Sequence, residues 1–396
     1  MLGRKRAIIS GLLLLAVALT ACGGSDGPVS PAGAEPGYTT ISLFEELLFA
    51  VPDTPDTRKF VMINDYAAAR EILGVPETGP DAELPALMQH IIDSVGQDSA
   101  NNTVYMAPGT LISGMGQGMW DRPLRPYLAF DVRNVDQSVE AGAVPFVLEL
   151  LRGRFDPEAT AQALAACSEC PPPDMKTHNG VSFYSWGEDG QGSLQGRYGP
   201  PAFDHLGRGG RIAVSSDYVY RTVETPGMQA LIDANIGLAP TLAEVEEIRL
   251  LSRAMSGLGA YSAFLSHETH RISRTPNDTS TFGPLPGTHD KLIAEIGRST
   301  LLLPYLSFAT GAGKDETGPY MALALVHGDA GSAEENARRL ERRIAENEEL
   351  QPWMEGLEGV EIKVEGRLLS AKLRGDRPAS GWRSLVFFIT PLIPHE

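Results

Sequence analysis

Three residues of the types that bind zinc stand close together at His267, Glu268 and His270. The metalloprotease pattern H-E-x-x-H places two histidines on one face of a helix, with the glutamate beside them. Here the second histidine comes one residue too early, and the preceding stretch GAYSAFL (259–265) has the composition of a strand. In an extended chain the two histidines would point to opposite faces. We therefore expect a polar loop and no metal site, and a metal-dependent hydrolase is the least favoured function.

Cys167 and Cys170 form a C-x-x-C pair. In an oxidising compartment the simplest outcome is a local disulfide. A thioredoxin-like redox pair would need a strand before the first cysteine and a helix after it. The sequence instead predicts a helix before the pair, and Pro171–Pro173 stops any helix after it. One such pair is also a weak signal for zinc, so we predict a structural disulfide.

Other stretches rich in glycine or arginine do not complete a catalytic motif. SGMGQGMW (113–120) lacks the last glycine of G-x-G-x-x-G and the helix that should follow, and Ser113 is not in a G-x-S-x-G turn. The stretch 196–211 reads as a long loop with aromatic and arginine side chains, which suit either an interface or a plain surface insertion. We assign no catalytic residue, cofactor-binding residue or cofactor, and the sequence leans away from an enzyme.

The N-terminus has the layout of an export signal. Arg4, Lys5 and Arg6 precede an apolar run from Ala7 to Ala21. This run of about fifteen residues is shorter than the roughly 20 residues that a membrane-spanning helix needs. Its length and its basic flank are those of a secretory signal peptide.

The end of this run, Leu19-Thr20-Ala21-Cys22, resembles the lipobox of bacterial lipoproteins. The resemblance covers only the first 22 residues. It implies that Cys22 carries a diacylglyceryl group and palmitate, and that the chain is cut just before it. Several acyl chains at one residue hold a protein firmly on a membrane. We therefore expect a membrane-anchored lipoprotein of the cell envelope that faces outside the cytoplasm.

Composition limits the partners of the exported domain. The chain has 396 residues, 42% of them hydrophobic and 21% charged, and a net charge of −17. Such an acidic surface repels phosphate backbones, so we expect no nucleic-acid partner. The lipid makes the membrane a partner, while any protein or small-molecule partner stays open.

Helix signals recur along the chain. Asp156-Pro157 and Thr225-Pro226 each read as a helix start. Capping boxes occur at Thr241-x-x-Glu244 and Ser332-x-x-Glu335. The first box precedes apolar residues at spacings of three or four, which predicts one amphipathic helix up to Leu258.

The predicted strands lie between these helices. They are the stretches 145–151, 180–186, 211–223 and 259–265, a hairpin around Glu365-Gly366, and a buried strand at 384–390. Two segments, from residue 145 and from residue 320, share the order strand, glycine, aspartate, helix, followed by a hairpin. We expect an α+β fold with antiparallel or mixed sheets, helices packed on one face, and two ferredoxin-like β-α-β-β units.

The segment 145–265, with RGRFDPEATAQAL, GVSFYSW and RIAVSSDYVYRTV, also resembles a broad group of uncharacterised exported bacterial proteins. This resemblance implies local structure and carries no activity.

These observations divide the chain into four parts. They are a signal peptide (1–21), a flexible tether (22–38), a larger α+β lobe (39–275) and a C-terminal portion with the second β-α-β-β unit (276–396). The favoured function is a lipid-anchored extracytoplasmic protein with a binding, structural or sensing role. The alternative is a solute-binding lipoprotein of a transporter, although that class needs parallel β-α-β crossovers and the hairpins argue against them.

Overall fold

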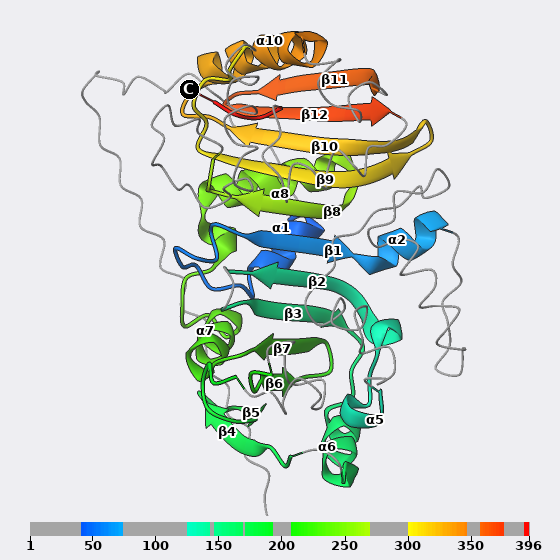
Figure 1. Cartoon of the computed structure of the whole chain (residues 1–396), viewed down its shortest axis with the longest axis vertical. Coiled ribbons are helices and arrows are strands. Elements are labelled where there is room, and N and C mark those ends of the chain that lie inside the picture. The colour runs from blue at the N-terminus through cyan, green and yellow to red at the C-terminus, as the bar shows by residue number, and fades with distance from the viewer. Residues whose placement is uncertain are drawn as a thin grey trace, which may run out of the picture. The chain divides into compact units, whose positions relative to one another are not determined.

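A computed structural model describes residues 41–73, 125–142, 146–168, 171–192, 207–269, 300–346, 357–375 and 392–395. Within these ranges, twelve strands form one sheet in the order β11-β12-β10-β9-β8-β1-β2-β3-β7-β6-β5-β4 (Figure 1). Every pair of neighbouring strands in this sheet is antiparallel. The α+β class with an antiparallel sheet is therefore confirmed.

The strands are β1 (Val61–Asp65), β2 (Val135–Ala141), β3 (Leu148–Gly153), β4 (Asp174–His178), β5 (Val181–Ser185), β6 (Arg211–Val214), β7 (Tyr218–Thr222), β8 (Ala260–Ser266), β9 (Ser307–Asp315), β10 (Gly318–Val326), β11 (Leu357–Glu365) and β12 (Leu368–Gly375). The α-helices are α1 (Leu43–Leu48), α2 (Tyr66–Leu73), α5 (Arg125–Leu128), α6 (Pro157–Ala166), α7 (Thr225–Asn235), α8 (Glu246–Leu258) and α10 (Ala330–Glu346). Short 3-10 turns occur at Val132–Asn134 and Leu242–Glu244.

The helices cover both faces of the sheet, whereas the sequence analysis expected one covered face. Leucine and methionine side chains of α1, α7 and α8 share a core with Val61 and Ile63 of β1. On the other face Met62 shares a core with Leu340 of α10, and α2, α5 and α6 contribute to a further cluster. The reason is visible in β8, which is buried at every residue. A strand without polar alternation needs cover on both sides.

Most of the predicted helix starts are confirmed, with local differences. The Asp156 side chain accepts from two backbone N–H groups of α6, with Pro157 at its first turn. The capping box at Thr241 and Glu244 forms, but it opens a 3-10 turn, and α8 begins only at Glu246. At the last helix Asp329 caps the backbone N–H of Ser332 (2.8 Å), so α10 begins earlier than its predicted capping box.

The sheet consists of two related halves that meet at β1 and β8. The N-terminal half is α1, β1–β3, α6 and β4–β7, and the C-terminal half is α8, β8–β10, α10, β11 and β12. Each half begins with a helix and a three-stranded meander. A second helix then packs on the sheet, α6 in the N-terminal half and α10 in the C-terminal half, and both lie on the same face. Further strands follow, and the last of them, β7 or β12, pairs with the third strand of the meander. The two helices that open the halves, α1 and α8, pack against each other. The C-terminal half contains the expected β-α-β-β order in β10, α10, β11 and β12, whereas in the N-terminal half four strands, β4–β7, follow α6. The two halves form the two ends of one continuous sheet.

The pairing registers of the two halves can be matched, apart from a β-bulge between Val135 and Gln137 of β2. Ala141 pairs with Leu148, which pairs with Thr222. In the C-terminal half Gly313 pairs with Tyr320, which pairs with Arg374. Matching Leu148 to Tyr320 therefore assigns each position of β2, β3 and β7 outside the bulge a counterpart in β9, β10 and β12. The sheet also runs across the boundary predicted at residues 275 and 276, because β8 pairs with β9.

Candidate functional site

A surface pocket of about 510 Å³ lies in the N-terminal half, where β2 begins, β3 ends and β7 begins. Its lining is almost entirely polar. The residues that line it are Leu43, Asp136, Gln137, Arg152, Gly153, Asp217 and Tyr218.

Backbone hydrogen bonds fix the floor of the pocket. The N–H of Gly153 donates to the carbonyl oxygen of Asp217 (2.9 Å), and the N–H of Phe155 donates to that of Ser216 (2.9 Å). The N–H of Arg154 donates to the carbonyl oxygen of Asn134 (2.9 Å). The end of β3 is thereby held between the start of β2 and the β6–β7 turn. Only glycine fits at position 153, because a Cβ there would lie 1.9 Å from the Asn134 oxygen.

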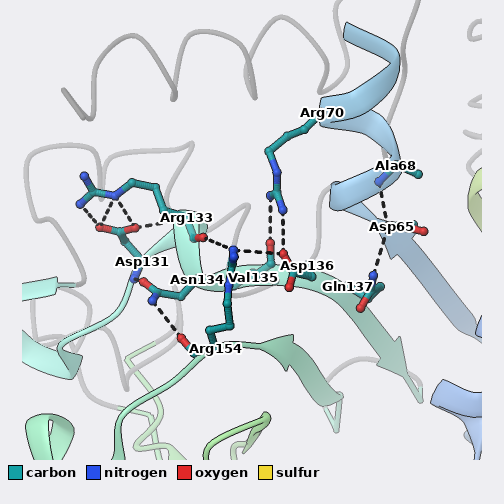
Figure 2. A network of polar contacts seen from close by, with 10 residues as sticks. All are labelled: Asp65, Ala68, Arg70, Asp131, Arg133, Asn134, Val135, Asp136, Gln137 and Arg154. Carbon is teal, nitrogen blue, oxygen red and sulfur yellow. Dashed lines mark hydrogen bonds and ion pairs between the residues drawn. The ribbon is translucent and has the colours of Figure 1, made fainter. Parts of the chain in front are cut away.

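Asp136 is oriented by two guanidinium groups, as Figure 2 shows. Arg70 of α2 donates to its Oδ1 at 2.8 Å, and Arg154 donates to the same oxygen at 3.3 Å. Arg70 also donates to the carbonyl oxygen of Val135 (3.0 Å). The other carboxylate oxygen of Asp136 has no partner among the described residues, and the side chain is 28% exposed. This oxygen is available to a ligand.

Gln137 is held from the other side by Asp65 at the end of β1. Its Nε2 donates to Asp65 Oδ1 at 3.2 Å, and the same oxygen accepts the N–H of Ala68 (3.1 Å) at the start of α2 (Figure 2). Burial raises the pKa of Asp65, while these hydrogen bonds partly offset that effect. The amide oxygen of Gln137 is left as a second free acceptor on the pocket wall.

A second ion pair stiffens the turn that leads into β2. Arg133 donates through Nε to Asp131 Oδ1 (2.8 Å), and its Nη2 contacts the other carboxylate oxygen. Asp131 is only 3% exposed. Asn134 donates its side-chain amide to the carbonyl oxygen of Arg154 (2.9 Å). Figure 2 shows these contacts beside those of Asp136 and Gln137, the two residues of the network that also line the pocket.

The opposite wall carries Arg152, Asp217 and Tyr218. Arg152 donates one N–H to Glu46 of α1 (3.1 Å), which leaves its other N–H groups open to the pocket. Asp217 accepts the hydroxyl of Ser216 (3.0 Å) through one oxygen only. The ring of Tyr218 stacks on that of Tyr220, with the ring centroids 6.1 Å apart. Residues that carry hydrogen-bond donors and residues that carry acceptors thus both line the pocket.

The residues singled out in the sequence lie elsewhere or outside the described ranges. Cys22 and the glycine-rich stretch 113–120 are outside them. Cys167 is the C-cap residue of α6, but Cys170 is outside the described residues, so the disulfide stays a prediction. The mass of the native protein with and without reductant tests it, and two freely alkylated thiols would contradict it.

His267 and Glu268 follow β8, while His270 is outside the described ranges. The N–H of His267 donates to the carbonyl oxygen of Arg58 (2.9 Å). Burial lowers the pKa of this imidazole, the carboxylate of Glu247 partly offsets that effect, and the cationic Arg58 lowers the pKa further. In the part of the chain that the structure describes, no three histidine, cysteine or carboxylate side chains come together as a metal site.

Of the predicted loop 196–211, the structure describes the last five residues. Arg211 is 1% exposed and has a structural role. It donates to the carbonyl oxygens of Trp186 (2.8 Å) and Gly187 (3.0 Å) and pairs with Asp189 (2.5 Å). Asp189 in turn accepts the backbone N–H of Thr225 (2.7 Å) at the start of α7.

The pocket residues were not predicted from the sequence. Asp136 and Gln137 belong to the strand VDQSVEA and Arg152 to the strand LELLRG, and no short motif joins them. The internal repeat was the one signal in the sequence that could have indicated them. A polar residue in one half that matches an apolar residue in the other half marks a position where the two halves differ.

Comparisons with known proteins give little further information. No family model and no curated protein matches the chain. Three crystal forms of TP0453 are similar to it in structure. Form III has 10% identity and a TM-score of 0.34, covering 85% of this chain and 97% of that one. Form I has 11% identity and a TM-score of 0.35, and the match covers 88% of this chain and 100% of that one. Form IV has 10% identity and a TM-score of 0.37, and the match covers 87% of this chain and 99% of that one. Among the described residues no helix is long and apolar enough to cross a membrane. The role of this chain must therefore be inferred from its own residues.

Proposed function

We propose that the protein is a lipid-anchored, extracytoplasmic binding protein of the cell envelope. The observation that carries the anchoring is the sequence Leu19-Thr20-Ala21-Cys22 after a basic segment and a short apolar run. Acylation of Cys22 would place two or three chains at the N-terminus, and each buried CH2 contributes about 0.8 kcal/mol of membrane affinity. The compositionally simple stretch 23–37 then links this anchor to the folded part.

Binding is favoured over catalysis by the way the pocket is built. Its charged groups are held by partners that already balance their charge, as with Arg70 and Arg154 at Asp136 and Glu46 at Arg152. Such pairs orient hydrogen-bonding groups well, and a fixed set of donors and acceptors around a concave opening is what a recognition site requires.

The test of the anchor is metabolic labelling with palmitate, followed by membrane fractionation. The wild type should carry label and sediment with membranes, and Cys22→Ser should lose the label and either become soluble or accumulate as precursor. Ser25→Ala is the matched control, because it changes one small residue of the tether and leaves the lipobox intact. A soluble, unlabelled wild type would contradict the proposal.

The alternative of a transporter's solute-binding lipoprotein gains no support from the fold. That class needs two α/β lobes with parallel β-α-β crossovers around a hinge. Here the described strands form one antiparallel sheet, and β8 and β9 join its two portions directly.

The metal-dependent hydrolase is also not favoured. The backbone of His267 is bonded to Arg58, whose positive charge opposes a bound cation. We expect zinc content to be unchanged by His267→Ala and by His270→Ala. Stoichiometric zinc that disappears in either variant, measured by elemental analysis, would restore this function.

A further inference from the structure

The two halves of the sheet differ at one place, and this difference marks the pocket as a binding site. In the matched registers Gln137 corresponds to Ala309, Arg152 to Ala324 and Asp217 to Leu369. All three counterparts are fully buried, at 0% exposure. Asp136 is the extra residue of a β-bulge between Val135 and Gln137. The counterpart of Phe308 is therefore Val135, and Asp136 has no counterpart in β9. In the C-terminal half these positions are buried, Ala309 and Ala324 in the cluster on one face of the sheet and Leu369 in the cluster on the other face. In the N-terminal half Gln137, Arg152 and Asp217 line a polar pocket.

Polar side chains at these positions lower the stability of the N-terminal half, and the fold itself does not require them. Apolar side chains at these positions stabilise the C-terminal half by burial, at about 25 cal/mol per Å² of apolar surface. The N-terminal half gives up this contribution. Its polar groups are instead kept apart from one another, each tied to a separate element: Asp136 to α2, Gln137 to the end of β1 and Arg152 to α1. This arrangement leaves their remaining hydrogen-bonding atoms available to a ligand.

We infer that the pocket binds a neutral, hydroxyl-rich small molecule, namely a mono- or disaccharide. The free acceptors are one carboxylate oxygen each of Asp136 and Asp217 and the amide oxygen of Gln137, and the free donors are the remaining N–H groups of Arg152 and the Tyr218 hydroxyl. A sugar hydroxyl both donates and accepts, so a molecule with several adjacent hydroxyls can bond to a lining that offers both donors and acceptors. A volume of about 510 Å³ has room for two sugar rings.

The charges of the lining exclude the simplest competitors. Asp136 is balanced by Arg70 and Arg154, and Arg152 is paired with Glu46. The pocket therefore presents no surplus of positive charge for a phosphate. The remaining carboxylate, Asp217, offsets the second guanidinium at Asp136, and it is exposed and bonded to a hydroxyl. One solvated carboxylate suits a hydrogen bond to a hydroxyl better than the capture of a multivalent cation.

This inference rests on the proposed binding role, and it is tested by calorimetry on the full acylated chain in a detergent without a sugar headgroup. The probes are N,N′-diacetylchitobiose and maltose, with putrescine and inorganic phosphate as cationic and anionic comparisons. We expect saturable binding of at least one disaccharide and none of the two ions. Asp217→Asn should weaken that binding about tenfold, because a hydrogen bond to a charged group is lost. Asp174→Asn, on the exposed edge strand β4, is the control and should bind as the wild type does.

Circular dichroism shows whether each variant folds. Should Asp217→Asn fail to fold, Tyr218→Phe removes only the hydroxyl and keeps the ring on Tyr220. Binding of putrescine or phosphate that depends on Asp217, or no binding of any disaccharide, would overturn the inference. Palmitate labelling that persists in the same preparation would then leave the anchored role standing, so the two failures are distinguishable.

Discussion

The ion pair between Glu45 of α1 and Arg253 of α8 should contribute strongly to the free energy of unfolding. Arg253 donates through Nε and Nη2 to the two oxygens of Glu45, each at 2.7 Å. Glu45 is 2% exposed, and the Arg253 side chain is 19% exposed. The neighbouring Glu46 makes a single contact of 3.1 Å to Arg152, with the two side chains 51% and 30% exposed. Two adjacent glutamates of one helix thus offer a buried pair and an exposed pair.

Glu45→Gln keeps the size of the side chain and removes its charge. Breaking a fully buried pair costs about 3–5 kcal/mol. Because Arg253 retains some contact with water, we expect about 2–3 kcal/mol here. For an exposed pair the figure is about 0.2–1 kcal/mol, which is the expectation for Glu46→Gln. With a urea m value of about 3 kcal/mol/M, the midpoint should fall by roughly 0.7–1 M in Glu45→Gln.

The assay is urea unfolding followed by far-ultraviolet circular dichroism for the wild type and both variants. Equal midpoints for Glu45→Gln and Glu46→Gln would refute the reasoning, since burial would then have no effect on the strength of these pairs. A changed slope would instead report an altered unfolded state.

Three further outcomes follow from the described contacts. Arg374 holds the pKa of Asp315 far below its ordinary value. The ionised Asp315 therefore stabilises the fold above about pH 4, and this contribution is lost as the pH falls below that value. Asp315→Asn should be less stable than the wild type at pH 7, and its stability should depend less on pH in acid unfolding titrations. Gly153→Ala should cost several kcal/mol in thermal unfolding, because its Cβ would lie 1.9 Å from the Asn134 carbonyl oxygen; an unchanged Tm would contradict the packing. Burial lowers the pKa of His267 in the folded state, so the unfolded chain takes up the proton first. The free energy of unfolding should therefore fall as the pH drops below about 6.5. His267→Ala should make the free energy of unfolding less dependent on pH in this range, and an unchanged dependence would contradict the prediction.

Local sequence signals predicted the elements better than their arrangement. Asp156-Pro157 and Gly366 act through their own backbone geometry, so the helix start and the hairpin at these residues were predictable. The strand VMIND (61–65) was not predicted, because it is short and runs directly into α2. Its place at the centre of the sheet depends on β2 and β8, which no local pattern reveals.

The site was out of reach for a related reason. Asp136, Arg70 and Arg154 come from three separate elements, and the sequence gives no sign that they meet. By contrast, Glu335 and Arg339 stand one helical turn apart, and they form an ion pair at 3.0 Å. Arg338 has Glu334 at the same spacing but contacts Glu335 (3.0 Å). Helix spacing fixes which side chains are neighbours, and rotamers decide among them.

The seam between the two halves has a consequence for the order of folding. Paired strands within each half are separated by between 2 residues (β4 and β5) and 69 residues (β1 and β2). At the seam Val61 pairs with Leu265, which comes 204 residues later. Local pairings form quickly, whereas a distant pairing must wait until both partners exist and must offset a larger closure entropy. During synthesis or export from the N-terminus, β1 therefore pairs with β2 and keeps its other edge unpaired until residues 260–266 arrive. An open edge with apolar Val61 and Ile63 is a template for pairing with other chains. We expect the nascent N-terminal half to need a chaperone, and the arrival of β8 to end that need.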